Sequence, residues 1–554
     1  MEQNTWQDTY PRPRLRREPY VLLNGPWDFA LTQGEMPTEY SRSINLPFAM
    51  EAPLSGVGAR HKKGDILWYR RAFRLPESFW GKRVLLHCGG IDQHGAVYLN
   101  RKPAGMLSFL SPTLELTELS EGENTLIIAV TDSAKDKAWP YGKQKEKRGG
   151  MWYTPVTGIW QTVWLEAVPQ RYVQDIVVTP QESGVKIEAK GVDAGTITLS
   201  DGAAYPLVDG EAVVVPENPI YWTPENPHLY DFTLKTAEDC VRSYFALRDI
   251  GIREKRLCLN GKPYFFHGLL DQGYWADGLY TPPDPSGYDR DILAMKELGF
   301  NTLRKHIKVE PKLFYYACDR LGMAVFQDMV NNGGYSFLRD TALPTIGLQK
   351  LPSDGWLHRN KRSRAMFLQW MAETVRRLRS HPCVMYWTIF NEGWGQFDSE
   401  AVYRRLRQLD GVRIIDSASG WFRGGETDVE SRHVYFKPFK MPEADKPVVL
   451  SEFGGYGWKL PDHCNSPDKT YGYRNFQDGA AYMDALEALY RDQILPAVSQ
   501  GLCAAVYTQL SDVEDEINGL LTYDREVCKA DAERMRALAD ALRDAAAQTD
   551  RSND

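Results

Sequence analysis

Long apolar runs are missing from this sequence of 554 residues. The first thirty residues contain Arg and Pro but lack the apolar core of about 7 to 15 residues that marks a signal peptide. No other stretch approaches the roughly 20 apolar residues that a membrane helix needs. We therefore expect a cytoplasmic protein with no membrane partner.

The common motifs for metal and cofactor binding are also missing. The eight cysteines lie far apart, with no CxxC pair and no zinc-type histidine spacing, so we expect reduced core residues. The dinucleotide-binding GxGxxG, the phosphate-binding P-loop and the nucleophile motif GxSxG are absent. The acidic run SDVEDE (511–516) lacks a calcium-loop spacing and is more typical of solvated surface. We expect no required metal and no organic cofactor.

Tracts of lysine and arginine are absent as well. The chain has 66 Lys and Arg against 73 Asp and Glu, a net charge of −7, and its pI is about 5.9. This balance argues against binding to nucleic acid, so we expect a small or neutral partner. The many aromatic residues, 16 Trp, 29 Tyr and 21 Phe, suit stacking on sugar rings or, equally, packing in large β-sandwich cores.

The first half of the chain shows the pattern of all-β domains. Over residues 1–168, short alternating runs such as WYRRAF and NTLIIAV predict a β-sandwich. The polar, glycine-bearing segment 132–158 predicts an extended surface loop. Residues 169–250 contain a second set of short strands and predict a small immunoglobulin-like β-sandwich.

Residues 251–554 show a different rhythm, in which short apolar strands alternate with amphipathic helices. We count eight candidate strands: YFFHGLL, FNTLRKH, MAVFQDM, VMYWTIFNE, RIIDSAS, RHVYF, PVVLSEFG and CAAVYTQLS. Eight strands over this length predict a (β/α)8 TIM barrel rather than an open doubly wound sheet. The Ala-rich closing stretch predicts a helix on the barrel exterior.

Two glutamates end barrel strands that lie far apart in the sequence. The fourth strand runs into Asn391 and Glu392, and the seventh into Glu452. Because barrel sites lie at the carboxyl ends of the strands, we expect both carboxylates to face one pocket. Two such groups are the minimum apparatus for cleaving a glycosidic bond, one donating a proton while the other is ionised.

Several segments resemble glycoside hydrolase family 2, which includes β-galactosidases, β-glucuronidases and β-mannosidases. LNGPWDFAL, GIDQHGAVYLNRKPAG and GGMWYTPVTGIWQTVWLE resemble its amino-terminal sugar-binding sandwich, a jelly roll. LNGKPYFFHG, ELGFNTLRKH, WTIFNEGWG and VLSEFGGYG resemble its barrel signatures. The resemblance implies a retaining exo-glycosidase in which Glu392 is the general acid and base and Glu452 the nucleophile. The two carboxyls are then expected about 5 to 5.5 Å apart, whereas about 6.5 to 9.5 Å would indicate inversion.

The resemblance also implies roles for four neighbouring residues. Asn391 is expected to hydrogen-bond the sugar 2-hydroxyl, and Arg304 to lower the pKa of the nucleophile. His306 contacts a sugar hydroxyl in this interpretation; the alternative is a packed structural histidine. Tyr435 resembles the tyrosine that hydrogen-bonds the nucleophile, with an ordinary core tyrosine as the alternative.

The sequence departs from the family in two places. Asp271 stands where many members carry an Asn-Arg-His-Glu run, and we hypothesise that it accepts bonds from two sugar hydroxyls. The Asn-x-Lys carboxylate clamp of glucuronidases is absent from DEINGLLTYDREVCK, which makes a glucuronide a weaker candidate. Trp394, Trp421 and Trp275 are candidate stacking walls, although each could equally be packing.

The leading hypothesis is an exo-β-glycosidase that removes a terminal sugar, with a β-galactoside favoured. One alternative is the same fold acting on a β-mannoside, an arabinoside or a uronide. Another is a catalytically inactive carbohydrate-binding protein, against which the intact pair Glu392 and Glu452 argues. A homodimer or larger homo-oligomer is plausible because the family often assembles.

Overall fold

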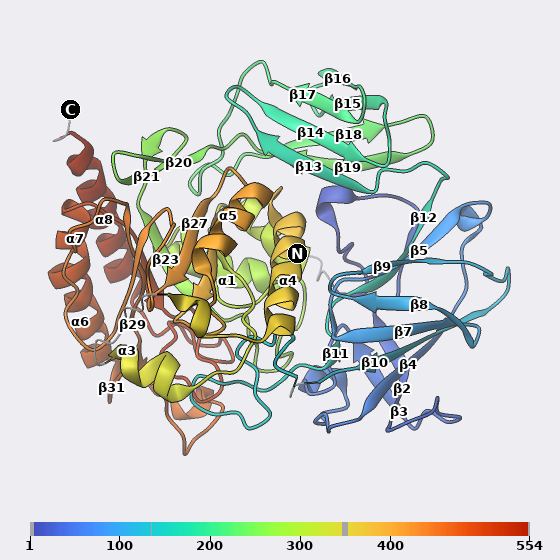
Figure 1. The fold of residues 1–554 in the computed structure, drawn as a ribbon, viewed down its shortest axis with the longest axis horizontal. Coiled ribbons are helices and arrows are strands. Elements are labelled where there is room, and N and C mark those ends of the chain that lie inside the picture. Colours follow the sequence, from blue (N-terminus) through green and yellow to red (C-terminus); the bar gives the residue numbers. More distant parts are fainter. Residues whose placement is uncertain (1–4, 134–135, 346–352, 552–554) are drawn as a thin grey trace.

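The computed structural model describes residues 5–133, 136–345 and 353–551. Two regions of antiparallel sheets precede a barrel of parallel strands and helices (Figure 1). In Figure 1 the first sandwich lies beside the barrel, and the second lies above them both. The predicted combination of two β-sandwiches with a TIM barrel is confirmed.

The first sandwich packs a four-stranded sheet against a six-stranded one. The smaller sheet has the order β1 (Tyr20–Leu22), β12 (Val163–Val168), β5 (Arg83–Cys88), β9 (Thr113–Leu116). The larger has the order β3 (Arg42–Leu46), β2 (Gly25–Thr32), β4 (Ile66–Phe73), β10 (Asn124–Thr131), β7 (His94–Leu99), β8 (Lys102–Ser108). Phe29, Tyr69 and Ile128 belong to the buried core of this sandwich.

The second sandwich contains one sheet of three strands and one of four. The first is β13 (Asp175–Pro180), β14 (Val185–Lys190), β17 (Glu211–Val214). The other is β16 (Ala204–Leu207), β15 (Gly195–Leu199), β18 (Tyr230–Lys235), β19 (Cys240–Phe245). Along β14, buried Val185, Ile187 and Ala189 alternate with more exposed residues, the pattern of a strand with one face on a core.

The barrel is a sheet of eight parallel strands, and they match the eight runs predicted from the sequence. In chain order they are β23 (Phe266–Asp271), β24 (Thr302–Lys305), β25 (Ala324–Asp328), β26 (Val384–Asn391), β27 (Ile414–Ser419), β28 (Glu430–Val434), β29 (Val448–Gly454) and β32 (Leu502–Thr508). The sheet order is β27-β26-β25-β24-β23-β32-β29-β28, and β27 contacts β28 where it closes. All eight residues of β26 are buried, as expected for a strand between a barrel core and its helices.

Helices cover the outside of the barrel. They are α1 (Gly287–Glu297), α2 (Lys312–Leu321), α3 (Leu343–Thr345), α4 (Lys361–Leu378), α5 (Ser399–Leu409), α6 (Gly479–Leu489), α7 (Leu495–Ser499) and α8 (Ala532–Arg551). Helix α2 ends at Gly322, whose φ of 78° lies in the left-handed region that favours glycine. The terminal helix α8 packs against α7, on the exterior as predicted.

The cysteines only partly follow the expectation. All eight are free, and five are buried, but Cys240 and Cys528 are exposed and Cys464 is partly exposed. The prediction of core residues is therefore wrong for these three, because sequence spacing alone does not tell which face of an element a side chain occupies.

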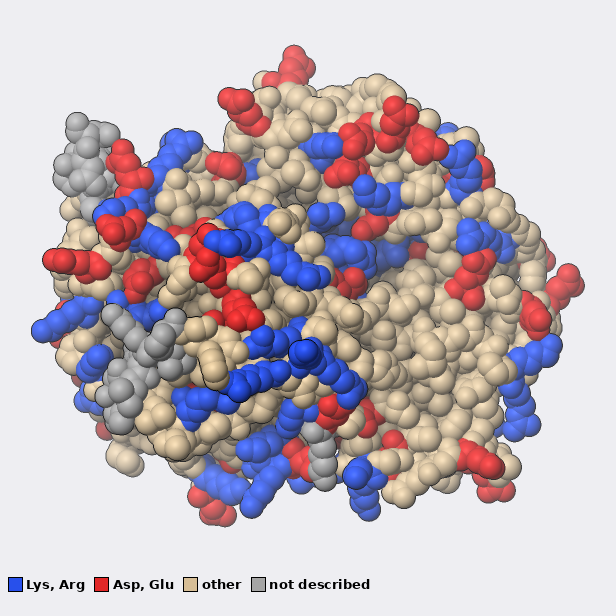
Figure 2. All heavy atoms as spheres, in the orientation of Figure 1, with Lys and Arg blue, Asp and Glu red and all other residues tan. Residues whose placement is uncertain are grey.

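Within the described ranges, no helix is both long and apolar enough to cross a membrane. Both signs of charge are mixed over most of the face in Figure 2, with Lys and Arg more concentrated over the region of α3 and α4.

Candidate active site

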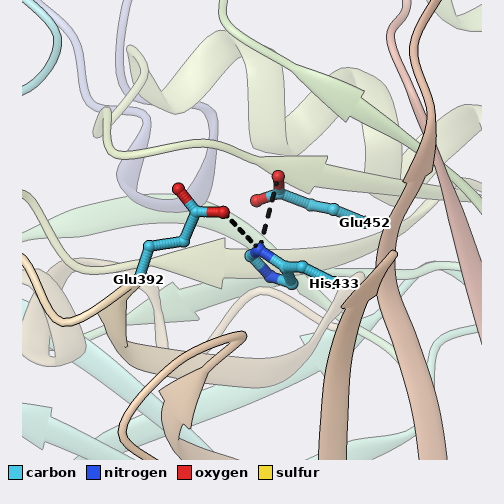
Figure 3. A group of neighbouring side chains, drawn as sticks. All are labelled: Glu392, His433 and Glu452. Carbon is cyan, nitrogen blue, oxygen red and sulfur yellow. Dashed lines mark hydrogen bonds and ion pairs between the residues drawn. The ribbon is translucent and has the colours of Figure 1, made fainter. Parts of the chain in front are cut away.

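Glu392 and Glu452 meet at one end of the barrel. Glu392 directly follows β26, and Glu452 lies in β29. Figure 3 shows the carboxylate groups of both residues beside His433. A carboxylate oxygen of Glu392 and one of Glu452 lie within 4.8 Å of each other. The side chain of Glu452 is 6% exposed and that of Glu392 24% exposed, so Glu392 stands nearer to solvent.

The backbone at Glu392 makes a sharp turn. Glu392 has a φ of 52°, a value that non-glycine residues rarely adopt, and Gly393 continues the turn with a φ of 73°. The Glu392 amide donates to the carbonyl oxygen of Ser419 on the neighbouring strand β27 at 2.9 Å. Strained residues held in this way cluster at functional sites, where the surrounding structure over-determines them.

Arg304, near the end of β24, links three polar residues of the site by hydrogen bonds. Its side chain is 1% exposed, and it donates through Nη1 to Glu452 Oε1 at 2.9 Å and through Nη2 to Asn391 Oδ1 at 2.8 Å. Its Nε donates to Asp328 Oδ1 at 3.0 Å. The bond to Asn391 occupies the amide oxygen and leaves the amide nitrogen as the donor of that side chain.

The environment keeps Glu452 ionised. Burial alone would raise its pKa, but the interactions with His433, Arg304 and His306 outweigh burial and lower the pKa to about 2. Tyr435 adds a hydrogen bond by donating its hydroxyl to Glu452 Oε2. At neutral pH this carboxylate is therefore negatively charged and held in a fixed orientation.

His433 lies between the two carboxylates. Its Nδ1 is 2.8 Å from Glu392 Oε1 and 3.5 Å from Glu452 Oε2, and its side chain is fully buried. On the other side of the ring, Nε2 lies 2.9 Å from Ser419 Oγ and 3.3 Å from Arg304 Nη1. A guanidinium only donates, so Nε2 is the acceptor and the neutral tautomer carries its proton on Nδ1. His433 then donates to Glu392.

His306 presents a free acceptor in the same region. Its Nδ1 bonds to Asp328 Oδ2 at 2.7 Å, and the side chain is 1% exposed. Burial and the positive charge of Lys143 lower the pKa of His306 to about 4, so the ring is neutral at pH 7. The bond to Asp328 places the proton on Nδ1, and Nε2 is buried with no partner in the described structure. A sugar hydroxyl is a suitable donor for this atom.

Aromatic residues pack next to these polar groups. Tyr435 stacks on Tyr473, with ring centroids 3.9 Å apart, and also bonds to Thr508 at 3.0 Å. The ring of Trp421 lies 5.9 Å from that of His433. Trp394 follows Glu392 by two residues and contacts Trp152, with ring centroids 5.2 Å apart.

The loop between β10 and β11 (Gly158–Ile159) brings the first sandwich to the barrel. Tyr141 in this loop donates its hydroxyl to the carbonyl of Gly333 at 2.6 Å, and Tyr153 bonds to buried Glu516. Between them stands Lys143, partly buried, whose charge acts on Glu452, His306 and Glu516. The segment predicted only as a surface loop therefore contributes to the mouth of the barrel.

The family model described as glycosyl hydrolases family 2, TIM barrel domain, matches residues 250–530, about half of the chain. The chain belongs to glycoside hydrolase family 2. This finding confirms the resemblance seen in the sequence. It covers the barrel and all the strands that carry Arg304, Glu392 and Glu452.

Curated relatives of this family 2 chain include both β-galactosidases and β-glucuronidases. The β-galactosidase of Thermoanaerobacter pseudethanolicus is 24% identical over 393 residues, which are 63% of this chain and 49% of that protein. The β-glucuronidase of Bacteroides fragilis is 22% identical over 518 residues, 85% of this chain and 70% of that protein. The chain thus spans about half the length of the first relative.

Solved structures share the fold of nearly the whole family 2 chain. A β-glucuronidase from an uncultured Clostridium species superposes with a TM-score of 0.73 at 18% identity, covering 95% of this chain and 98% of that one. A β-galacturonidase from Eisenbergiella tayi, bound to galacturonate, gives a TM-score of 0.68 at 18% identity, covering 96% and 98%. At these identities the likeness establishes the fold alone.

Asp271 does not join the site of this family 2 barrel. Its partner in the β23–β24 register is Lys305, whereas Leu270 pairs with Arg304, so Asp271 lies on the opposite face of the strand from the Arg304 side. Its Oδ2 forms an ion pair with Lys305 at 2.6 Å, and its Oδ1 accepts from the Gly273 amide at 2.8 Å. Asp271 pairs with Lys305 on the side of the strand away from Arg304, which corrects the hypothesis that Asp271 binds two sugar hydroxyls.

The acidic run 511–516 also differs from the expectation. Asp512, Glu514 and Glu516 are each 3 or 4% exposed rather than solvated. Their charges meet protein partners: Asp512 pairs with Lys529 at 2.7 Å, and Glu514 accepts from the Thr154 amide at 3.0 Å. The run is buried because the loop of the first sandwich covers it, a contact that local sequence does not reveal.

One group of side chains among the described residues has ligand atoms close enough for a metal ion, and it is Glu392, His433 and Glu452 itself. His433 donates its Nδ1 proton to Glu392 in the arrangement above, so this nitrogen has no lone pair for a metal.

Trp275 belongs to the buried core, beneath Arg525, whose guanidinium lies 4.2 Å from its ring centre.

Sequence reasoning missed several residues of the site. His433 lies in β28 and stands two residues before Tyr435, which directly follows that strand, so alternation along the chain is the signal that could have found it. Asp328 ends the third strand, the same criterion that selected Glu392. Lys143 and Trp152 carried no such signal because they reach the barrel from a distant loop.

Proposed function

We propose that this chain is a retaining β-glycosidase that releases a terminal sugar by double displacement, with Glu452 as nucleophile and Glu392 as general acid and base. The spacing of the two carboxylates carries the proposal. Carboxylate oxygens within 4.8 Å of each other suit the retaining arrangement, which needs about 5 to 5.5 Å between carboxyl groups, better than the inverting one, which needs about 6.5 to 9.5 Å.

In the first step Glu452 attacks the anomeric carbon while Glu392 protonates the departing oxygen. The low pKa of Glu452 keeps it ionised, and the bonds from Arg304 and Tyr435 fix its attacking direction. Glu392 is the more exposed of the two, which suits an acid that meets the leaving group toward the entrance. The C–O bond to the leaving group breaks, and a glycosyl ester forms on Glu452.

In the second step the ionised Glu392 takes a proton from water, which attacks the anomeric carbon and frees Glu452. The Asn391 amide nitrogen is available to the sugar 2-hydroxyl, because its amide oxygen is held by Arg304. The Nε2 atom of His306 can accept from another hydroxyl. Both contacts strengthen the hold on the sugar as positive charge develops on its ring.

The test is a panel of p-nitrophenyl α- and β-glycosides assayed with wild type, Glu452→Gln and Glu392→Gln. We expect hydrolysis of a β-glycoside, a loss of at least about 10³-fold in Glu452→Gln, and a smaller loss in Glu392→Gln for this good leaving group than for an alkyl glycoside. Glu400→Gln, on the exposed face of α5, is the control. NMR of the first-formed sugar reads the stereochemistry. Release of the α-anomer, or full activity in Glu452→Gln, would contradict the proposal.

The sugar has two candidates. A β-galactoside is favoured by the sequence, and β-galactosidases are among the curated relatives. An acidic sugar, a β-uronide, is favoured by Lys143. Its charge acts on Glu452, and within the described residues its ammonium has no ion pair or hydrogen bond. A cation without a counter-ion beside the site suits a substrate carboxylate. Lys143 would then bind the carboxylate of the sugar in place of the Asn-x-Lys clamp, which this chain lacks.

A further inference from the structure

A second cavity lies where the two sandwiches and the barrel meet. It is lined by Trp164 of the first sandwich, Asp175 of the second and Lys312 at the start of α2, among other residues. Of the described residues that line it, none belongs to the candidate active site. The cavity is therefore separate from the place where Glu392 and Glu452 meet.

The walls of this junction cavity carry more positive than negative charge. Five cationic side chains line it, Arg12, Arg14, Lys312, Arg376 and Arg377, together with two carboxylates, Asp175 and Glu310. Both carboxylates have other partners. Glu310 accepts from Lys305 and Lys308, each at 2.8 Å, and Asp175 pairs with Arg376 at 3.2 Å. Arg376 is itself one of the five cations, and both it and Arg377 also pair with Glu373. Arg12 lies 4.0 Å from Glu166. Among the described residues that line the cavity, the surplus positive charge therefore belongs to Arg14 and Lys312.

Two of these cations have no counter-ion in the described parts of the chain. Arg14 is 8% exposed, forms no ion pair, and leaves Nε and Nη2 buried without a hydrogen-bond partner. Lys312 forms no ion pair or hydrogen bond through its ammonium, and burial together with the charge of Arg12 lowers its pKa to about 7. Arg14 is buried and Lys312 is partly buried, and a cation in such a place is costly unless something pairs with it.

The amino end of α2 adds further positive charge to the wall of the cavity. The helix has ten residues, begins after Pro311 and has no side-chain cap at its amino end. The Phe314 amide donates to the Pro311 carbonyl at 3.0 Å, so the orphaned donors of this first turn are the amides of Lys312 and Leu313. The helix dipole places partial positive charge at the same point. Pro311, Lys312 and Leu313 of this first turn all line the cavity. Two cations without a counter-ion, Arg14 and Lys312, and the amino end of α2 therefore all line the same cavity.

We propose that this junction cavity binds a small oxyanion of the phosphate class, held by Arg14, Lys312 and the amino end of α2. An oxyanion accepts the guanidinium and ammonium hydrogens that the protein leaves unpaired. Bound there, it joins elements of all three domains and stabilises their arrangement. The inference is independent of the reaction proposed above, because it rests on different residues.

The experiment measures the thermal midpoint and the binding of inorganic phosphate to the full chain. Protein dialysed into chloride buffer is titrated with phosphate, sulfate or glucose 6-phosphate at constant ionic strength, and phosphate is counted by equilibrium dialysis. We expect a saturable rise in Tm of about 2 °C or more and about one phosphate per chain in wild type. A response to phosphate but not to glucose 6-phosphate identifies the free ion as the ligand, and the reverse identifies an organic phosphate.

Three variants separate a built site from a general salt effect. Lys312→Met and Arg14→Gln are expected to lose the rise in Tm and the bound phosphate. Arg16→Gln, an exposed neighbour whose side chain is 44% exposed, is expected to keep both. In chloride, Lys312→Met should match or exceed the Tm of wild type, because it removes repulsion from Arg12. Equal responses in all variants, or no response to either phosphate compound in wild type, would overturn the proposal, and Lys312→Met decides it if Arg14→Gln fails to fold.

Discussion

Nδ1 of His433 lies 2.8 Å from Oε1 of Glu392, on the same side of the ring on which it also approaches Glu452 at 3.5 Å. One buried imidazole thus sets the orientation of the acid relative to the nucleophile. It does so while its other nitrogen is fixed by Ser419 and Arg304.

We expect His433→Ala to lower kcat/KM by about 10- to 100-fold, because Glu392 loses a partly buried hydrogen bond worth about 1.5 to 3 kcal/mol. The loss should be larger for alkyl than for p-nitrophenyl glycosides, since it falls on proton donation. His433→Asn keeps an N–H near the position of Nδ1 and should recover part of the activity. An equal loss with both leaving groups would show that His433 is only structural.

Arg304 is expected to set the acid limb of the pH profile. The pKa of Glu452 is depressed to about 2, so Glu452 is ionised above that pH. Removing the guanidinium in Arg304→Met lets burial raise this pKa, and the acid limb of kcat/KM should move to higher pH. Arg304→Lys keeps the charge and should shift the limb less. A limb that stays in place in Arg304→Met would contradict this assignment.

Asp271→Ala should affect stability rather than specificity. It leaves Lys305 paired with Glu310, so the cost should lie below the about 3 to 5 kcal/mol of a buried pair whose charge is left without any partner. The pKa of Asp271 is lowered, with Lys305 outweighing burial, so its contribution is present above the ordinary pKa of an aspartate and is lost as the pH falls through the lowered value.

Denaturant unfolding at pH 7 and at pH 3 measures this effect, and the gap between wild type and Asp271→Ala should narrow at the lower pH. The relative rates on different aryl glycosides should remain as in wild type. A changed substrate ranking would restore Asp271 as a sugar-binding residue.

Lys143 should separate the two candidate sugars. If the substrate is a uronide, Lys143→Met should raise KM about 10-fold or more through the loss of an ion pair, with little effect on a neutral galactoside. Lys147→Met, exposed on the same loop, is the matched control. Equal effects of Lys143→Met on acidic and neutral sugars would remove the uronide candidate.

The sequence predicted the barrel well because each strand is a short run of buried apolar residues, a signal that needs no knowledge of distant contacts. The same logic located Glu392 and Glu452 at strand ends. It misplaced Asp271 because a polar residue at a strand end can face either side of the wall, and only the pairing of Leu270 with Arg304 decides which.

Long-range contacts account for the rest. The run 511–516 looks solvated by composition, but Tyr153 and Thr154 of a distant loop bury it. Lys143 belongs to that same loop and had no local pattern to mark it. Such residues become visible only when the domains are packed together.

The loop that carries Lys143 and Trp152 belongs to the first sandwich, but it lies at the mouth of the barrel and forms part of the candidate active site. Transplanting residues 136–157 between members of the family should therefore carry substrate preference with them, even if every barrel residue is left untouched. By the same reasoning, an isolated barrel would keep Glu392 and Glu452. It would lose the side of the proposed sugar site that the loop of the first sandwich forms.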